Sequence, residues 1–188
     1  MKIVISELIW PIGVEVLEQK GWTVVYDPEL VRDREKLASE IKTADALIVR
    51  NQTKVDQELL AEAEQLRVVG RLGVGLDNLD LDAIADRNAV AVFAKNANAT
   101  SVAEYVVSAM IASSRSLEKA SMDVKNGNWD RRKHTGGELS GKTLGLIGVG
   151  EIGHRVAVRA RHLGLKVIGH DPFVGPFDFP IMESGIEL

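Results

Sequence analysis

Short apolar runs alternate with longer amphipathic stretches over the first half of the chain. The apolar runs predict five strands buried on both faces, at Ile3–Ile5, Thr23–Tyr26, Ala46–Val49, Val68–Val69 and Ala91–Phe93. The stretches between them predict helices near Ile12–Gln19, Glu35–Thr43, Gln57–Ala63 and Leu81–Arg87. This alternation is typical of a parallel sheet with right-handed crossovers. Residues 1–97 are therefore expected to form one α/β domain.

A longer helical pattern follows, and we expect a single helix over about residues 101–126. Ser101 and Glu104 fit the S-x-x-E capping box at its start. Gly127 stands where a left-handed cap would end it. The charged, glycine-containing segment 126–140 is interpreted as a loop. Beyond it a second α/β unit begins near Gly141, so residues 98–188 are predicted to form a second domain.

Residues 143–171 carry the pattern of a dinucleotide-binding turn. A predicted strand, Thr143–Ile147, leads into the glycine turn GVGEIG, a helix and a second strand, Lys166–His170. Gly148 permits the tight turn, Gly150 lets a pyrophosphate approach the backbone, and Gly153 lets the helix lie close to the strand. The first-turn N–H groups of the helix would face the phosphates.

The residue after the second predicted strand completes this pattern. Asp171 is placed to accept both ribose hydroxyls of NAD, and it favours NAD over NADP because its carboxylate would repel a 2′-phosphate. A third strand is expected at about Ile186.

Composition narrows the classes of partner. The net charge of −4 argues against nucleic acid and anionic membranes, and Arg131–Lys133, the only basic run, is interpreted as solvated surface. The chain has no cysteine, which excludes disulfides and thiolate chemistry, and we predict no metal site. The apolar stretch at the start of the chain is too short, and the acidic Glu7 follows it too early, for a signal peptide. No apolar run approaches the ~20 residues of a membrane span. A cytoplasmic protein is expected.

Two loops at the carboxyl ends of predicted strands are candidates for a ligand site. Arg50–Lys54 offers a guanidinium and neutral donors, and Gly70–Asn78 offers glycine N–H groups that could hold an anion. Together they suit a small carboxylate. An equally weighted alternative is that the glycines only serve tight turns, that Arg50 pairs with an acid, and that Asp77 and Asn78 cap the next helix.

Several segments, in this order, resemble the D-isomer-specific 2-hydroxyacid dehydrogenases, and within them the phosphoglycerate dehydrogenase-like and sulfolactate-type branch. They are GRLGVGLDNLD at 70–80, NATSVAE at 98–104, the GNW at 127–129 and GELSGKTLGLIGVGEIG at 137–153. The resemblance runs from about residue 1 to 175. It implies a flavodoxin-like parallel-sheet substrate domain over 1–97, followed by the start of a truncated Rossmann NAD-binding domain over 98–188.

The resemblance also implies an activity and site residues. The activity is NAD-dependent interconversion of a D-2-hydroxy acid and a 2-oxo acid. The backbone at Val74 and Gly75 would hold the substrate carboxylate, and Arg50, Asn51 and Gln52 would shape its far end. The cofactor would be bound by Asn98, Ser101, Gly148, Gly150, Glu151, Ile152, Gly153 and Asp171. The helix near 101–126 would take part in a homodimer interface.

Two features depart from the family pattern. Lys95 stands where the family usually has proline, and Glu151 is acidic beside an expected anion. The family's catalytic arginine, glutamate and histidine, and the C-terminal segment that returns to the first domain, lie downstream of the glycine turn. We therefore expect no catalytic residue in these 188 residues and no activity of this chain alone. The alternative is a non-enzymatic NAD-binding or interaction module of the same fold.

Overall fold

A computed structural model of the 188-residue chain describes residues 1–175, 186 and 187. The chain divides into two compact units, 1–97 and 98–188. Within the described residues, no helix is both long and apolar enough to cross a membrane.

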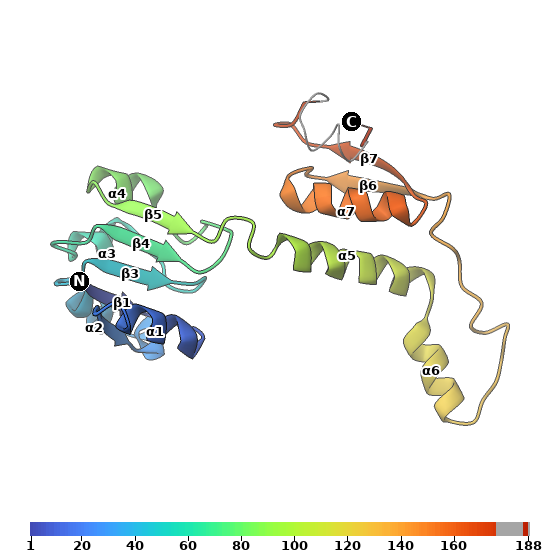
Figure 1. Cartoon of the computed structure of the whole chain (residues 1–188), viewed down its shortest axis with the longest axis horizontal. Helices are drawn as coiled ribbons and strands as arrows, with labels where there is room; N and C mark the ends of the chain where they lie inside the picture. The colour runs from blue at the N-terminus through green and yellow to red at the C-terminus, as the bar shows by residue number, and fades with distance from the viewer. Residues whose placement is uncertain (176–185, 188) are drawn as a thin grey trace. The chain divides into compact units, whose positions relative to one another are not determined.

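The first unit is built on a five-stranded parallel sheet. Its strands run in the order β2-β1-β3-β4-β5, the flavodoxin-like order. The fold class predicted from the sequence is thus confirmed: all neighbouring strands are parallel, and the arrowheads of β3, β4 and β5 point the same way in Figure 1. The strands are β1 (Lys2–Ile5), β2 (Thr23–Tyr26), β3 (Ala46–Val49), β4 (Val68–Arg71) and β5 (Val90–Phe93).

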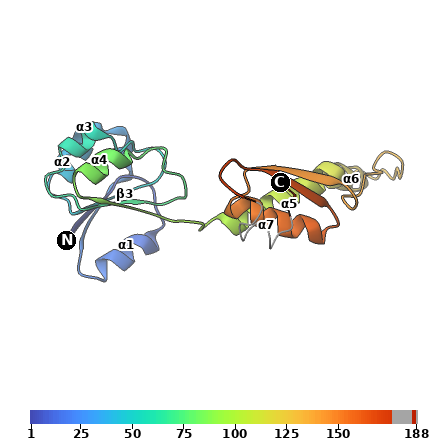
Figure 2. The same ribbon diagram turned by 90° about the horizontal axis from the view of Figure 1, so that it is seen from above.

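Helices cover the two faces of this sheet unequally. The α1 helix lies on one face, and α2, α3 and α4 lie on the other (Figure 2). The helices are α1 (Pro11–Glu18), α2 (Arg34–Ile41), α3 (Gln57–Ala61) and α4 (Leu81–Asp86), with a 3-10 turn at Pro28–Arg32 that the sequence pattern did not predict. Asp80, and not Asp77 or Asn78, caps α4, because its carboxylate accepts from the N–H of Ala83 at 3.0 Å.

The core follows the strand alternation. Val4, Leu47 and Val69 face the larger cluster under α2, α3 and α4, whereas Ile3, Ile5 and Ala46 face the smaller cluster under α1. The prediction that all five strands are buried on both faces is wrong for β2 and β5. These are the edge strands, and Val90 and Val92 in β5 are exposed because the cluster under α1 does not extend to them.

The second unit begins with two helices where the sequence pattern predicted one. They are α5 (Ala99–Ser114) and α6 (Leu117–Lys125), separated by Arg115 in an extended conformation. The hydroxyls of Ser113 and Ser114 donate to carbonyls three residues earlier, at 2.8 and 2.9 Å. The break thus follows two serines whose hydroxyls are bonded to the backbone of the preceding turn.

The capping box predicted at Ser101 is also wrong. The α5 helix begins two residues earlier, so Ser101 lies inside its first turn and Asn98 occupies the cap position without a side-chain hydrogen bond. The left-handed cap at Gly127 is confirmed, with a φ of 79°. It follows α6 and not one continuous helix.

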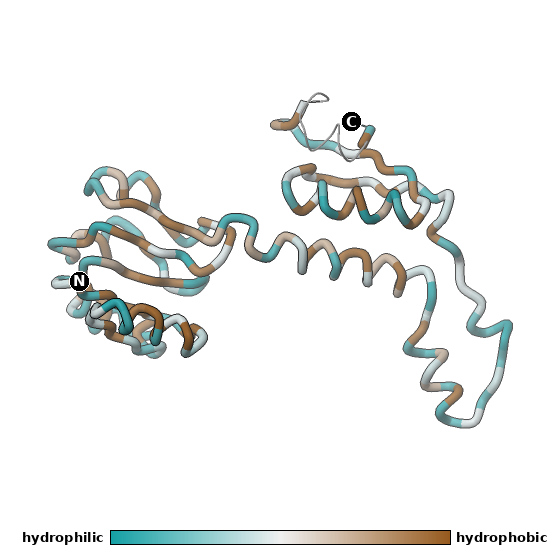
Figure 3. Tube along the Cα trace, in the orientation of Figure 1, coloured by the Kyte–Doolittle hydropathy of each residue, from teal (hydrophilic) through white to brown (hydrophobic). Residues whose placement is uncertain are grey.

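The remainder of this unit is a strand–helix–strand segment. The strands β6 (Thr143–Ile147) and β7 (Lys166–His170) are parallel neighbours joined by α7 (Glu151–His162). Hydrophobic and hydrophilic residues alternate along the turns of α7, as expected for a helix with one buried face (Figure 3). Glu187 forms a parallel bridge with Ile168, beside β7, where a third strand was predicted.

Candidate functional site

A buried carboxylate organises the predicted substrate loop. Glu7 follows β1 and is 3% exposed. It accepts hydrogen bonds from four consecutive backbone N–H groups after β3, with shortest distances of 2.8 Å to Arg50, 3.2 Å to Asn51, 3.1 Å to Gln52 and 2.9 Å to Thr53. Glu7 therefore fixes the backbone of the segment that contains three predicted substrate residues.

The ionisation of Glu7 reflects this environment. Burial raises the pKa of its carboxyl, but the backbone hydrogen bonds from Thr53, Arg50 and Gln52 together outweigh burial, and the net pKa lies below the ordinary 4.5. The carboxylate is therefore charged at neutral pH. Arg50 does not form an ion pair with it: the guanidinium Nη1 donates to the carbonyl of Leu8 at 2.9 Å. Among the residues that the structure describes, Arg50 has no acidic partner, so the alternative that it pairs with an acid is wrong there.

Asn78 ties the loop after β3 to the loop after β4. Its Nδ2 donates to the carbonyls of Arg50 at 3.2 Å and Thr53 at 2.8 Å, and its Oδ1 accepts from Arg71 Nε at 3.4 Å. The hydroxyls of Ser6 and Thr53 lie 2.9 Å apart and add a bond to the loop after β1. Loops after three adjacent strands are thus held at one edge of the sheet.

The glycine loop Gly70–Asn78 encloses a cation that the sequence analysis did not single out. The side chain of Arg71 is 9% exposed, and a Cβ added at Gly73 would lie 2.0 Å from its Nη1. Gly73 is thus needed for this close approach. The Val74–Gly75 backbone, predicted to hold a carboxylate, therefore lies beside a nearly buried guanidinium, whose nearest carboxylate, on the exposed Asp77, is 3.8 Å away.

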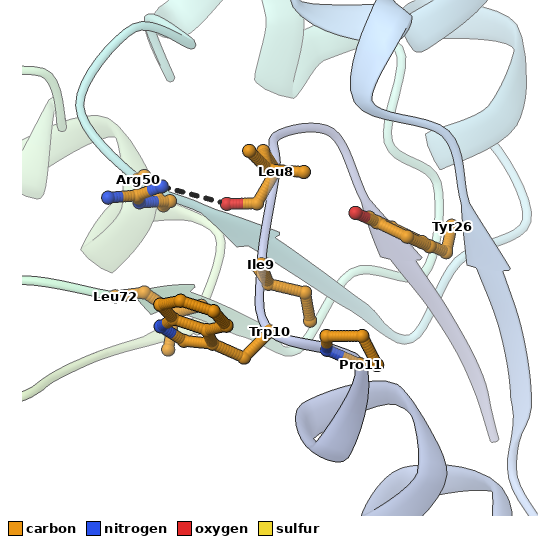
Figure 4. A pocket seen from close by; sticks show the side chains of 7 residues that line it. All are labelled: Leu8, Ile9, Trp10, Pro11, Tyr26, Arg50 and Leu72. Carbon is orange, nitrogen blue, oxygen red and sulfur yellow. Dashed lines mark hydrogen bonds between the residues drawn. The ribbon is translucent and has the colours of Figure 1, made fainter.

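An apolar pocket adjoins Arg50. It has a volume of about 530 Å³ and is lined by Leu8, Ile9, Trp10, Pro11, Tyr26, Arg50 and Leu72. Four of these residues are consecutive, Leu8–Pro11, and run from the segment after β1 to the first residue of α1, as Figure 4 shows; the Arg50 guanidinium lies at one side against Leu8. Its presence was not predicted, because the hydrophobic pattern assigns this short segment to a loop.

The glycine turn of the second unit has the geometry that its sequence predicts. Gly148 has a φ of 87°, a conformation that favours glycine. A Cβ added at Gly153 would lie 2.5 Å from the carbonyl oxygen of Gly148, whereas one at Gly150 would meet no atom within 4 Å. The helix can therefore approach the strand only without a side chain at 153, and open space lies before the backbone at 150.

Two acidic residues flank this turn. Asp171 accepts from the N–H of Val149 at 2.8 Å and from the N–H of Phe173 at 2.9 Å, and these bonds hold the pKa of its carboxyl below the ordinary value. Each oxygen retains a lone pair for a ribose hydroxyl. Glu151 is bound by Arg155 one helical turn on, at 2.5 Å, which offsets its charge beside Ile152 and an expected phosphate.

All four histidines lie in the second unit. His134 lies 2.7 Å from Asp123, and His162 lies 2.7 Å from the carbonyl of Val158. Asn98 and Ser101, two further predicted cofactor residues, lie at the start of α5, Asn98 at its N-cap and Ser101 in its first turn. No cluster of three metal-ligating side chains occurs among residues 1–175, 186 and 187.

Residues 3–157 match the family described as D-isomer specific 2-hydroxyacid dehydrogenase, catalytic domain. The chain belongs to this family. A D-3-phosphoglycerate dehydrogenase of Methanocaldococcus jannaschii is 39% identical over 100% of the chain and 35% of its own length. An (S)-sulfolactate dehydrogenase of Chromohalobacter salexigens is 44% identical over 92% of the chain and 55% of its own length.

The fold agrees with those of solved structures. A D-lactate dehydrogenase of Aquifex aeolicus, crystallised with NAD and lactic acid, aligns with a TM-score of 0.80 at 24% identity, over 99% of this chain and 55% of that one. The chain thus spans from about a third to about half of the length of these relatives.

The sequence analysis did not identify two residues of the site, Glu7 and Arg71, although each has a sequence feature that could have indicated it. Glu7 is an acid directly after a buried strand, at the same sheet edge as the two candidate loops. Arg71 lies within the glycine run itself, where a long cation beside small residues indicates that the glycines make room for it. The hydrogen-bond partners of both depend on strand order, which the sequence pattern does not specify.

Proposed function

We propose that the protein is an NAD-dependent oxidoreductase that interconverts a D-2-hydroxy acid and a 2-oxo acid. The observation that carries the proposal is that one chain of this family contains two units with different binding features. One presents guanidinium groups and ordered N–H groups at the carboxyl edge of a parallel sheet. The other presents a glycine turn followed by an acid at the end of the next strand.

The first unit would bind the substrate. Arg71, beside the Val74–Gly75 backbone, supplies positive charge for the carboxylate, and the loop Arg50–Gln52, which Glu7 fixes, meets the rest of the molecule. A guanidinium and backbone N–H groups together suit a planar carboxylate. The surrounding hydrogen bonds leave little freedom to these loops, so the site is preorganised.

The second unit would bind the cofactor. The turn Gly148–Gly153 fits a pyrophosphate, because Gly150 leaves open space before the backbone and the N–H groups of Glu151 and Ile152 begin a helix. Asp171 would accept the ribose hydroxyls, and its negative charge would disfavour a 2′-phosphate, which selects NAD over NADP. When bound, NAD supplies the hydride acceptor or donor. Asn98 and Ser101 would lie on the nicotinamide side.

The proposed reaction also needs a proton donor, and the proposed dimer needs a contact surface. Protonation of the substrate oxygen during hydride transfer needs a general acid within about 3 Å. We assign this role to none of the four histidines. We therefore expect these 188 residues alone to bind cofactor and substrate but to convert the substrate slowly or not at all. We also propose a cytoplasmic homodimer that uses α5, where Tyr105 is 75% exposed.

A second candidate is a non-enzymatic NAD-binding module, which the same glycine turn would serve. Both candidates require selective binding of NAD, and calorimetric titration with NADH and NADPH tests it. We expect NADH to bind at least about tenfold more tightly than NADPH, and Asp171→Asn to reduce this difference in affinity. Equal affinities in the wild-type chain would contradict the assignment of Asp171. Consumption of NADH with a 2-oxo acid, by this chain or by a longer product of the same gene, would exclude the module.

A further inference from the structure

Arg155 links the beginnings of two helices that pack together in the second unit. Its Nε and Nη2 donate to one oxygen of Glu151, at 3.0 and 2.5 Å, and its Nη1 donates to the hydroxyl of Thr100 at 2.8 Å. Glu151 is the first residue of α7, whereas Thr100 is the second residue of α5 and lies 55 positions before Arg155 in the chain. One guanidinium therefore holds together two segments that are distant in the sequence and adjacent in the fold (Figure 1).

The packing of α5 on α7 involves small side chains. Ala99 and Ala103 lie on one face of α5, as residues four apart, and Ala157 and Ala160 lie on α7; all four are at most 1% exposed. Methyl groups allow a close approach, but their burial has no directional preference. A charge-assisted hydrogen bond has a preferred length and angle. The bond from Arg155 to Thr100 therefore selects one placement of the first turn of α5 on α7.

The two helix starts carry the two halves of the proposed cofactor site. The N–H groups of Glu151 and Ile152 are assigned to the pyrophosphate, and Asn98 and Ser101, which flank Thr100 in the chain, are assigned to the nicotinamide side. Both places would be spanned by one NAD molecule. The affinity for NAD then depends on their spacing, because a first turn of α5 that is free to shift would have to be ordered on binding.

We infer that Arg155 is a positioning residue for the cofactor and that it acts through Thr100. It holds the first turn of α5 at a fixed place relative to the turn Gly148–Gly153, so that the nicotinamide half of NAD meets contacts that are already formed. This role rests on the proposed function and adds a residue to it. The same guanidinium also neutralises Glu151, which is a separate effect on the pyrophosphate end of the site.

Two ligands that differ in the nicotinamide ring separate these two effects. NADH carries the ring, whereas ADP-ribose has the same adenosine, pyrophosphate and second ribose without it. Calorimetric titration of the full chain would use both. In Thr100→Val, which removes the acceptor and leaves the pair of Arg155 with Glu151, we expect the NADH affinity to fall about threefold and the ADP-ribose affinity to stay unchanged.

Two threonine variants control for the substitution itself. Thr100→Ser keeps the hydroxyl and should restore the NADH affinity of the wild-type chain. Thr135→Val is the matched control in the same unit: the Thr135 hydroxyl donates to the carbonyl of Arg131 at 2.8 Å, so its loss should alter the affinity for neither ligand.

Arg155→Lys is a second probe of the same bond. An ammonium neutralises Glu151 but lacks the planar fork that reaches two acceptors at once. This variant should reproduce the loss for NADH, and Thr100→Val added to it should lower the affinity no further, because both changes break one bond. Urea unfolding, followed by the fluorescence of Trp129 in a background with Trp10→Phe and Trp22→Phe, checks that each variant is folded in the titration.

Three results would overturn this role of Arg155. They are equal losses for NADH and ADP-ribose, which would assign Arg155 to the pyrophosphate end alone, an unchanged NADH affinity in folded Thr100→Val, and losses that add in the double variant. In all three the wild-type chain binds NADH, so the proposed cofactor turn stands. If the wild-type chain binds neither ligand, the proposed cofactor turn fails, and the role of Arg155 fails with it.

Discussion

Removing the Glu7 carboxylate should loosen the substrate loop and destabilise the first unit. In Glu7→Ala, four N–H groups lose their acceptor. A hydrogen bond to a charged group contributes about 1.5–3 kcal/mol. Only the donor of Thr53 is on a buried residue, while the other three are on exposed residues that water can reach. We therefore expect a loss of about 3 kcal/mol, and about 2 kcal/mol for Glu7→Gln, which keeps one acceptor oxygen.

Urea unfolding can isolate this effect. Trp10 and Trp22 lie in the first unit and Trp129 in the second, so a Trp129→Phe background makes tryptophan fluorescence report on the first unit. The midpoint should fall in Glu7→Gln with an unchanged slope. Glu18→Gln, at the exposed end of α1, is the matched control and should shift stability by less than about 0.5 kcal/mol.

The pH dependence gives an independent signature of Glu7. The folded pKa lies below the ordinary 4.5, so the unfolded chain takes up a proton first as the pH falls below about 4.5. The stabilisation from Glu7 is therefore fully present above that pH and is lost as the pH falls toward the folded pKa. The difference in free energy of unfolding between wild type and Glu7→Gln should therefore become smaller as the pH falls below about 4.5.

Two results would refute the reasoning about Glu7. The first is a Glu7→Gln variant as stable as wild type near neutral pH. The second is a gap that stays constant or widens below pH 4.5, which would mean that the folded carboxyl does not hold its charge more strongly than the unfolded one.

Three further predictions concern the glycine turn. Gly153→Ala should cost about 2 kcal/mol, because its Cβ would lie 2.5 Å from a carbonyl oxygen, whereas Gly145→Ala, with no atom within 4 Å, should be neutral; urea unfolding followed by the fluorescence of Trp129, in a background with Trp10→Phe and Trp22→Phe, reports on this second unit. Gly150→Ala should keep the fold but lower NADH affinity about tenfold in calorimetry, since the methyl enters the space before the backbone; unchanged affinity would argue against a pyrophosphate there. Arg155→Met should weaken NADH binding several-fold by unmasking the charge of Glu151, and adding Glu151→Gln should restore it; no recovery in the double variant would contradict the electrostatic cause.

The strands and the glycine turn could be predicted from the sequence because their signals are local. An apolar β-branched run such as Ala46–Val49 has few alternatives to a buried strand, and the positive φ of Gly148 is a property that glycine alone tolerates readily. The family resemblance rests on the same local motifs. These features define the fold class and the candidate cofactor turn.

The details that sequence analysis missed depend on contacts between distant segments. The break after α5 follows Ser113 and Ser114, whose hydroxyls bond to backbone carbonyls, and helical periodicity alone does not reveal it. Glu7 meets residues 43 to 46 positions away, a pairing set by the order of β1 and β3 in the sheet. The place of Arg71 against Gly73 likewise requires the folded loop.

The central claim is a hydride exchange between NAD and a D-2-hydroxy acid, and enantiomeric substrates test it most directly. The longest product of this gene would be supplied with NAD and with the D and L forms of phenyllactate and lactate, and nicotinamide absorbance would be followed. The account predicts NADH formation with the D enantiomers and little or none with the L enantiomers. Formation of NADH from the L enantiomers, or from no 2-hydroxy acid at all, would contradict it.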